Sequence, residues 1–394
     1  MIRPASSADL AEWVSSSRER FGDEGFPVVT GQGADNPPGD LDSQPRLAVS
    51  LGHLSRVLDF RPRDLTISVE AGMRMSELAG ILDEAGLWLP LAAGAEERSV
   101  GGWVAAAPVG RFDHGFGPVR RHVLSCDLVH WNGTVTRWGR PVMKNVAGYD
   151  VVKLLCGSRG RLGLMTAVSL RLWPKPRAYR EFELRGEILR DPKSLSNGAP
   201  PLDAVSWSSM PRARMSPAAS VCLVGGSGSV EGRAEGLERW AADADLDIRE
   251  VEPATGPTSE RPARPGTSAV YRVAFGRRYL VGGLKDLVRR VEHETDAWRL
   301  DAAPASGVVR LLTEDQAAAG RRQAPPWLAT LGDASAGTRE STSALAGPAV
   351  RIERGGEAEH ALARRMRSAG AREIERRWLG AFGGIAVPWQ ADYL

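Results

Sequence analysis

The sequence is poor in cysteine and has no long apolar run. Its three cysteines, Cys126, Cys156 and Cys222, lie far apart and form no CxxC pair. This spacing indicates neither an iron–sulfur cluster, a zinc site nor a disulfide scaffold. A stretch of about 18 apolar residues is also missing, so we expect no transmembrane helix. The first residues, MIRPASSADLAEW, have no apolar segment behind their arginine, so we expect no secretory signal and a cytoplasmic protein.

The net charge and the spacing of the histidines exclude some functions without indicating one. The net charge is +3 on 394 residues, without a basic block, which argues against nucleic acid as the main partner. The six histidines form no HxH or HExxH pair, so no metal site is predicted. A complete site for oxidising a hydroxyl group needs a positioned base. The sequence does not identify one, and we assign no catalytic residue.

The first part of the chain alternates strands and helices. We expect a helix over residues 6–20, with Ser6 or Ser7 as its N-cap. Gly86 ends a second helix, and Asn132-Gly133 marks a β-hairpin, because Asn-Gly between alternating strands is typical of such turns. The remaining elements expected here are strands at 27–30, 65–70, 123–131 and 134–138, a helix at 76–85, and a small-residue helix or turn ending at Ala107.

The most informative segment is residues 142–177, VMKNVAGYDVVKLLCGSRGRLGLMTAVSLRLWPKPR. Its glycines allow positive φ and let a flat or anionic ligand approach the main chain. Residues 166–173 alternate β-branched and aliphatic residues and are typical of a buried strand. Pro174 and Pro176 cannot donate to a sheet, so they end the strand and, we expect, the domain.

The motif KNVAGYD, followed by GSxGxLGxxT and a strand ending in PKP, resembles the flavin-binding domain of the vanillyl-alcohol-oxidase (PCMH) type. Within that family the similarity is greatest to the FAD-binding E subunits of bacterial glycolate oxidases. The resemblance implies an α+β fold: a PCMH-type FAD-binding domain of two α/β subdomains, then a ferredoxin-like α+β cap. We place the FAD-binding domain at residues 1–178, the cap-like domain with Pro/Ser/Gly-rich insertions at 179–350, and a C-terminal helix and tail at 351–394.

The resemblance also implies a set of FAD-binding residues. Gly31, Gln32 and Gly33 follow a strand where the family has its first pyrophosphate loop, although such a pair of glycines is often only a turn. Ser99, Gly101 and Gly102 match the second wall of the pyrophosphate channel; the alternative is a tight turn before a packed helix. The segment from Gly157 to Gly163 would wrap the ribityl chain, pyrophosphate or adenine, through Gly157, Ser158, Gly160, Leu162 and Gly163.

The flavin ring itself is assigned to residues 144–150. Its pyrimidine edge needs hydrogen bonds and its redox state a nearby charge or dipole, which could come from Lys144, Asn145, Ala147, Gly148 and Tyr149. Tyr149 and Asp150 would alternatively form a hydrogen-bonded core pair. Arg111 and Arg120 could reach phosphate or a carboxylate, although solvated arginines are favoured. His114 is a candidate flavin neighbour or an ordinary loop residue.

These features predict an FAD-dependent oxidoreductase subunit that binds FAD non-covalently. The resemblance implies a multi-subunit 2-hydroxy-acid (glycolate) oxidase, in which a D-type FAD subunit carries the substrate base and an iron–sulfur subunit completes the complex. Such a complex could lie against the inner membrane. One alternative is a self-sufficient FAD oxidoreductase. Another is an assembly subunit that has lost FAD, which the departures at Asp35, Ala167 and the C-terminal tail favour. A UDP-sugar enolpyruvate reductase of the same fold ranks last.

Overall fold

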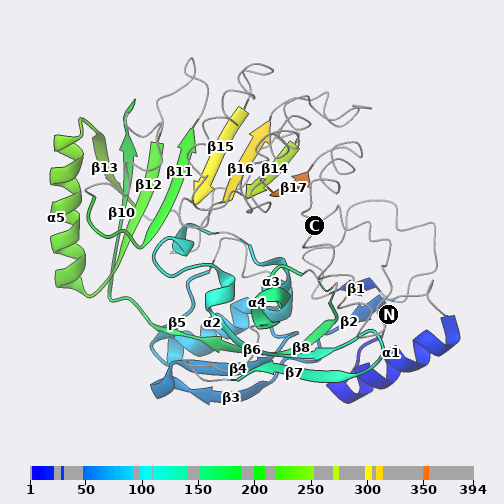
Figure 1. The fold of residues 1–394 in the computed structure, drawn as a ribbon. Helices are drawn as coiled ribbons and strands as arrows, with labels where there is room; N and C mark the ends of the chain where they lie inside the picture. The colour runs from blue at the N-terminus through cyan, green and yellow to red at the C-terminus, as the bar shows by residue number, and fades with distance from the viewer. Residues whose placement is uncertain are drawn as a thin grey trace, which may run out of the picture.

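The computed structural model describes the following residues: 2–21, 28–30, 48–91, 98–108, 110–140, 151–158, 160, 162–187, 199–209, 218–252, 269–274, 298–303, 308–313 and 349–354. Two large antiparallel sheets dominate the described part, with helices packed on them (Figure 1). The α+β class expected from the sequence is confirmed.

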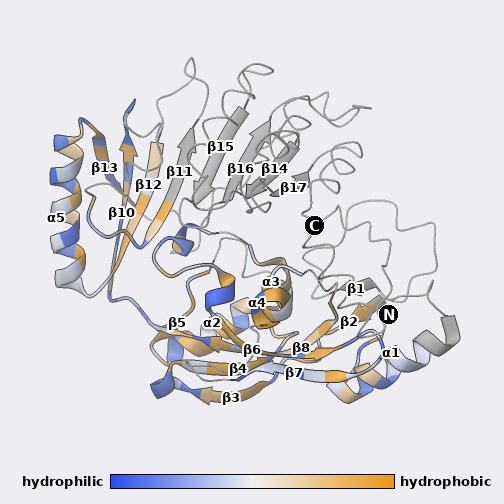
Figure 2. Cartoon of the chain, in the orientation of Figure 1, coloured by the Kyte–Doolittle hydropathy of each residue, from blue (hydrophilic) through white to orange (hydrophobic). Residues whose placement is uncertain are grey.

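The first sheet has five strands in the order β3-β4-β8-β6-β7. Ile67, Val69, Val168 and Leu170 line one face, and Trp103 of helix α3 packs into the same core. Figure 2 shows that hydrophobic residues predominate in β4, β6 and β8. The elements of this sheet and its helices are β3 (Val57–Arg61), β4 (Thr66–Glu70), α2 (Met75–Glu84), α3 (Val100–Ala106), β6 (Val123–Val129), β7 (Val135–Gly139), α4 (Val151–Leu155) and β8 (Leu164–Arg171).

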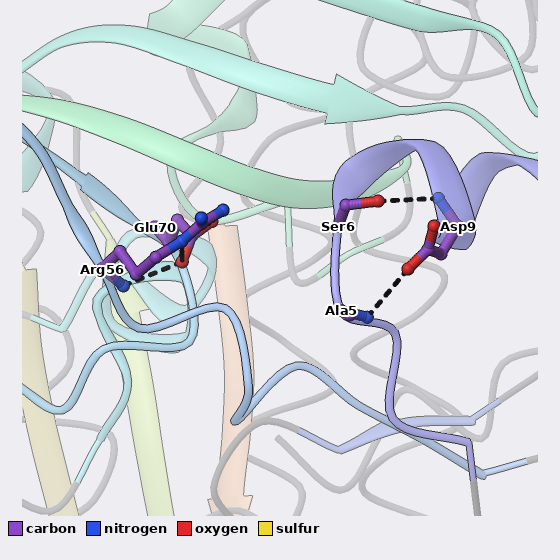
Figure 3. Close-up of polar contacts among 5 residues, drawn as sticks. All are labelled: Ala5, Ser6, Asp9, Arg56 and Glu70. Carbon is purple, nitrogen blue, oxygen red and sulfur yellow. Dashed lines mark hydrogen bonds and ion pairs between the residues drawn. The ribbon is translucent and has the colours of Figure 1, made fainter.

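Helix α1 (Ser7–Phe21) precedes this sheet and begins at the expected cap. The Ser6 hydroxyl accepts the Asp9 amide at 3.1 Å, while the Asp9 carboxylate accepts the Ala5 amide at 3.2 Å (Figure 3). These bonds satisfy donors that a helix start leaves unpaired. Leu10 and Val14 of α1 form a small core with residues of β6, β8 and β2. Strand β1 (Val28–Thr30) pairs with β2 (Ala48–Ser50) in parallel.

The β6–β7 hairpin is confirmed, but its loop differs from the simplest Asn-Gly turn. The Gly133 amide donates to the His130 carbonyl at 2.9 Å, and the His130 amide donates to the Thr134 carbonyl at 2.8 Å. Gly133 has a φ of +80°, whereas Asn132 does not share this positive φ. The loop is therefore one residue longer than a two-residue turn, and Gly133 occupies the left-handed position that follows a type I turn.

The Arg56–Glu70 pair closes the open end of the β3–β4 hairpin (Figure 3). Glu70 has 8% of its side chain exposed and accepts the Arg56 amide at 2.8 Å and Nη2 at 2.7 Å. Burial by itself would raise the pKa of Glu70, but the hydrogen bonds from Arg56 bring it below its usual value. The carboxylate is thus held ionised immediately before the Ala71-Gly72 turn.

The second sheet has eight strands in the order β13-β10-β12-β11-β15-β16-β14-β17, all antiparallel. Helix α5 (Ser227–Asp243) covers β10, β12 and β13 through Val230, Ala234, Leu237 and Ala241. The strands are β10 (Ala178–Arg185), β11 (Ala204–Ser209), β12 (Ala218–Gly225), β13 (Asp247–Val251), β14 (Ala269–Ala274), β15 (Trp298–Ala303), β16 (Val308–Thr313) and β17 (Ala349–Arg354).

Strand β17 pairs with β14 and runs across residue 350, so this sheet includes residues that the sequence assigned to the C-terminal segment. Between the two large sheets, β5 (Leu87–Trp88) pairs with β9 (Trp173–Pro174). Residues 355–394, to which the sequence assigns the C-terminal helix and tail, lie outside the described residues. No helix within the described ranges has the length and apolarity to cross a membrane.

Candidate functional site

The turn at residues 99–102 is held entirely by protein acceptors. The Ser99 hydroxyl caps α3 by accepting the Gly102 amide at 3.1 Å. The Val100 amide donates to Met73 O at 2.8 Å, and the Gly101 amide donates to Ala71 O at 2.7 Å. A Cβ added at Gly101 would lie 2.9 Å from the Ala71 Cβ. The missing side chains at this turn therefore allow α3 to pack closely against the end of β4.

The second glycine-rich turn, residues 157–163, leads from α4 into β8. Gly157, Gly160 and Gly163 have φ values of +82°, +75° and +137°, which favour glycine. A Cβ at Gly163 would lie 2.8 Å from Val129 O, so this glycine serves strand packing. At Gly160 a Cβ would meet no atom of the described residues within 4 Å, so with respect to these residues the turn is open on that side.

Helix α3 links the two turns: Ser99 caps its N-terminal end, and Gly157 contacts its C-terminal end. The Gly157 amide donates to Val104 O of α3 at 3.0 Å, and a Cβ at Gly157 would lie 3.6 Å from the Ala107 Cβ. Leu162 is 4% exposed and belongs to the core of the first sheet, while the Ser158 amide donates to Leu155 O at 3.1 Å. The structure thus brings residues 99–102 and 157–163 to opposite ends of one packed unit built on α3.

The other sequence-predicted site residues fall outside the described part of the chain. They are Gly31, Gln32, Gly33, Lys144, Asn145, Ala147, Gly148 and Tyr149. Their flanking elements are described: β1 ends at Thr30, and α4 begins at Val151, one residue beyond the 144–150 motif.

The open turn fits the FAD that the sequence predicts. Phosphate groups bind best to main-chain N–H donors and to positive charge. The sequence GSRGRLG contains no acidic residue, and arginines stand on both sides of Gly160. In contrast, the amides of residues 100–102 already donate within the protein. The 99–102 turn therefore shapes the wall of the expected pyrophosphate channel but supplies no main-chain N–H donors to phosphate.

A buried polar cluster joins the two sheets, and the sequence did not predict it. Arg111, which is 6% exposed, donates from Nη1 to Glu181 Oε1 at 2.8 Å and from Nη2 to Tyr179 Oη at 3.0 Å. Tyr179 and Ser220 donate to the same carboxylate at 2.9 and 2.7 Å. The expectation of a solvated Arg111 is therefore wrong, because Glu181, 70 residues away in sequence, draws its guanidinium into the interface.

The electrostatics of this cluster favour fixed charges. Burial opposes ionisation of Glu181, but the Arg111 guanidinium and the hydroxyls of Ser220 and Tyr179 bring its pKa below the usual value. Burial likewise acts to lower the pKa of Arg111, and the Glu181 carboxylate more than offsets it. Burial also raises the pKa of the Cys222 thiol to about 12. Glu181 is thus an ionised acceptor that is already saturated with donors.

The described histidines near the interface serve structural contacts. His122 is 2% exposed; its Nε2 faces Gly117 O at 3.1 Å, and Trp173 Nε1 donates to its Nδ1 at 3.5 Å. Burial lowers the pKa of His122 to about 4, so the ring is neutral at physiological pH. Burial also lowers the pKa of His114, against an opposing effect of Asp203. In the described ranges no three metal-ligating side chains gather into a site.

Comparison with known proteins gives one family and several relatives. Residues 1–139 match the family described as FAD binding domain. The glycolate oxidase subunit GlcE of Escherichia coli (strain K12) is 37% identical over 134 residues, which cover 34% of this chain and 38% of that protein. The glycolate oxidase subunit GlcD of Bacillus subtilis (strain 168) is 29% identical over 150 residues, covering 38% and 32%.

Among solved structures, p-cresol methylhydroxylase with substrate bound superposes with a TM-score of 0.68 over 96% of this chain and 85% of that chain. At 14% identity this likeness shows the fold alone. The matched stretch spans 38% of one relative and 32% of the other. The family match ends at residue 139, before the 144–150 motif from which the sequence resemblance was drawn.

Proposed function

We propose, from the match of residues 1–139 to the family described as FAD binding domain, that this chain is the FAD-binding subunit of a 2-hydroxy-acid oxidase. In this proposal glycolate is the substrate class, and a D-type flavoprotein carries the base that removes the hydroxyl proton. An iron–sulfur subunit completes the complex. The similarity to GlcE and GlcD supports this assignment.

The observation that carries the proposal is the open turn at Gly160, fixed to α3 through the Gly157–Val104 hydrogen bond. We assign the dinucleotide to this turn and to Gly31, Gln32 and Gly33. Gly157, Ser158, Leu162 and Gly163 shape the turn, and Ser99, Gly101 and Gly102 form the wall that positions α3. When bound, FAD supplies the two-electron acceptor for oxidation of a 2-hydroxy acid.

Residues 144–149 are assigned to the flavin ring. In the proposal Asn145 and the main chain at Ala147 and Gly148 hold the pyrimidine edge, Tyr149 forms one wall, and Lys144 supplies positive charge. These side chains orient the ring and tune its charge environment, and none of them is assigned the role of base.

We assign the substrate base to a partner subunit because neither Glu181 nor His122, at the sheet interface, can accept a substrate proton. Glu181 is ionised, 7% exposed and bound by three donors, so it is not free to accept a substrate proton. His122 is buried and bonded on both ring nitrogens. Neither group meets the requirement for a general base, which must reach the substrate with an accepting lone pair.

Anaerobic titration of the purified FAD-loaded chain with glycolate and D-lactate tests this proposal. We expect the flavin absorbance to persist with the chain alone and to bleach when a D-type partner is added. Bleaching of the isolated chain would instead establish a self-sufficient oxidoreductase. Failure to bind FAD would favour the assembly-subunit alternative.

A further inference from the structure

The loop at residues 110–122 packs against the second sheet. Phe112 is 1% exposed and packs with Ala204, Cys222 and Val224 of the second sheet. The Gly115 amide donates to Asp203 O at 3.0 Å, and a Cβ at Gly115 would lie 2.8 Å from Asp203 Cα. This loop therefore holds the second sheet by apolar packing as well as by main-chain contact.

The strand register explains why Glu181 of the second sheet faces this loop. Glu181 of β10 lies opposite Cys222 of β12, which belongs to the Phe112 cluster. The alternate residues of β10, Phe182 and Leu184, are buried in the same sheet. A carboxylate on the Phe112 side must be neutralised after burial, and Arg111 of the loop supplies the charge.

The same loop continues from the packed unit that carries the candidate FAD turn. Helix α3 ends at Ala106, and the Arg111–Asp113 turn begins five residues later. Val104 of α3 accepts the Gly157 amide, so a displacement of the loop reaches residues 157–163 through one short helix.

We propose that the Arg111–Glu181 pair is a latch that holds the second sheet against residues 110–122 and, through α3, slows the release of FAD. The first part concerns the fold alone, and the second part rests on the proposed FAD-binding function. Arg111 is in this view a positioning residue and takes no part in the chemistry.

Thiol labelling with N-ethylmaleimide, read by peptide mass spectrometry, tests the first part. Cys222 is 0% exposed beside Phe112, whereas Cys126 is 1% exposed in the core of the first sheet. We expect Arg111→Met and Glu181→Gln to label Cys222 on the order of tenfold faster than wild type, because each leaves a buried polar partner unmatched. Labelling of Cys126 should stay at the wild-type rate.

Two further variants control this experiment. Arg111→Lys keeps the charge without the two-pronged contact and should fall between wild type and Arg111→Met. Arg180→Gln removes the neighbouring arginine, which pairs with Glu250 on the exposed side, and should leave Cys222 protected. Unchanged Cys222 labelling, or a parallel rise at Cys126, would overturn the latch. If Arg111→Met does not fold, Glu181→Gln and Arg111→Lys decide the question.

The FAD dissociation rate, followed by the recovery of free flavin fluorescence, tests the second part. It should rise on the order of tenfold in the variants that expose Cys222 and remain unchanged in Arg180→Gln. If Cys222 is labelled faster but the FAD dissociation rate is unchanged, the proposed link between the Arg111–Glu181 pair and FAD release is wrong, while the latch between the pair and the second sheet stands. A wild-type chain that binds no FAD would contradict the proposed function instead, and the labelling result would still decide the latch.

Discussion

The Ser99 hydroxyl accepts the Gly102 amide at 3.1 Å, so α3 carries its own cap at the turn where a phosphate contact was expected. Replacing Ser99 by Ala removes this bond and should lower the free energy of unfolding by about 1 kcal/mol. Ser99→Asn, which can still cap the helix, is the control and should cost less. A urea titration that gives equal losses for the two variants would contradict the capping role.

The glycines at 101 and 160 should respond differently to alanine. Gly101→Ala places a Cβ 2.9 Å from Ala71 Cβ and 3.1 Å from Ala71 O, so overpacking should cost about 1–3 kcal/mol of stability. At Gly160 the added Cβ meets no atom of the described residues within 4 Å, and the positive φ opposes it, at roughly 1–2 kcal/mol.

Gly101→Ala and Gly160→Ala also distinguish a glycine required for packing from one required for contact with FAD. Gly160→Ala should weaken FAD binding on the order of tenfold if the open main chain receives the dinucleotide. Fluorescence titration with FAD measures this, with stability determined in parallel by denaturant. Unchanged FAD affinity in Gly160→Ala would remove the turn from the site.

Acidification should destabilise the fold through His122. Its folded-state pKa of about 4 lies below the unfolded value near 6.5, so the unfolded chain binds the proton more tightly. Stability is therefore complete above about pH 6.5 and falls as the pH drops toward 4, by on the order of 3 kcal/mol. His130, whose pKa burial also lowers to about 4, acts in the same direction.

The variant His122→Gln tests whether His122 causes the acid sensitivity, because glutamine keeps an N–H donor for Gly117 O but does not titrate. Its unfolding free energy, measured by denaturant between pH 4 and 7, should fall less steeply than that of wild type. A slope equal to that of wild type would assign the acid sensitivity to other groups.

Glu70 and Arg56 should contribute unequally despite sharing one ion pair. Glu70→Gln replaces a carboxylate that is 8% exposed and accepts three Arg56 donors, and should cost about 1–3 kcal/mol. Arg56→Gln changes a side chain that is 71% exposed and keeps the main-chain donor, so its effect should be smaller. Thermal unfolding of the two variants would contradict this asymmetry if their midpoints coincided.

Much of the first sheet and its helices could be predicted from residues that are close together in the sequence. Ser6 as an N-cap, Gly86 after α2 and the β6–β7 hairpin each depend on residues within one turn of each other, and all three are confirmed. The details of the hairpin loop were not predictable from Asn-Gly alone. A Cβ at Gly133 would lie 2.8 Å from Ala11 O, so the tip also packs against α1.

The interface between the sheets could not be predicted in the same way. Arg111 lies in a loop with further arginines at 120 and 121, and nothing local distinguishes it. Its partner follows only from the pairing of β10 with β12, which places Glu181 beside Ser220 and Cys222. The role of Ser99 was similarly ambiguous, because a cap and a phosphate contact use the same hydroxyl and glycine pattern.

The most direct test of the central claim is the flavin content of the chain purified without added cofactor. The absorption spectrum and the flavin released on denaturation should give close to one FAD per chain, freed intact because no covalent link is expected. A colourless chain that takes up no FAD in equilibrium dialysis would contradict the assignment of residues 31–33 and 157–163 to a dinucleotide site.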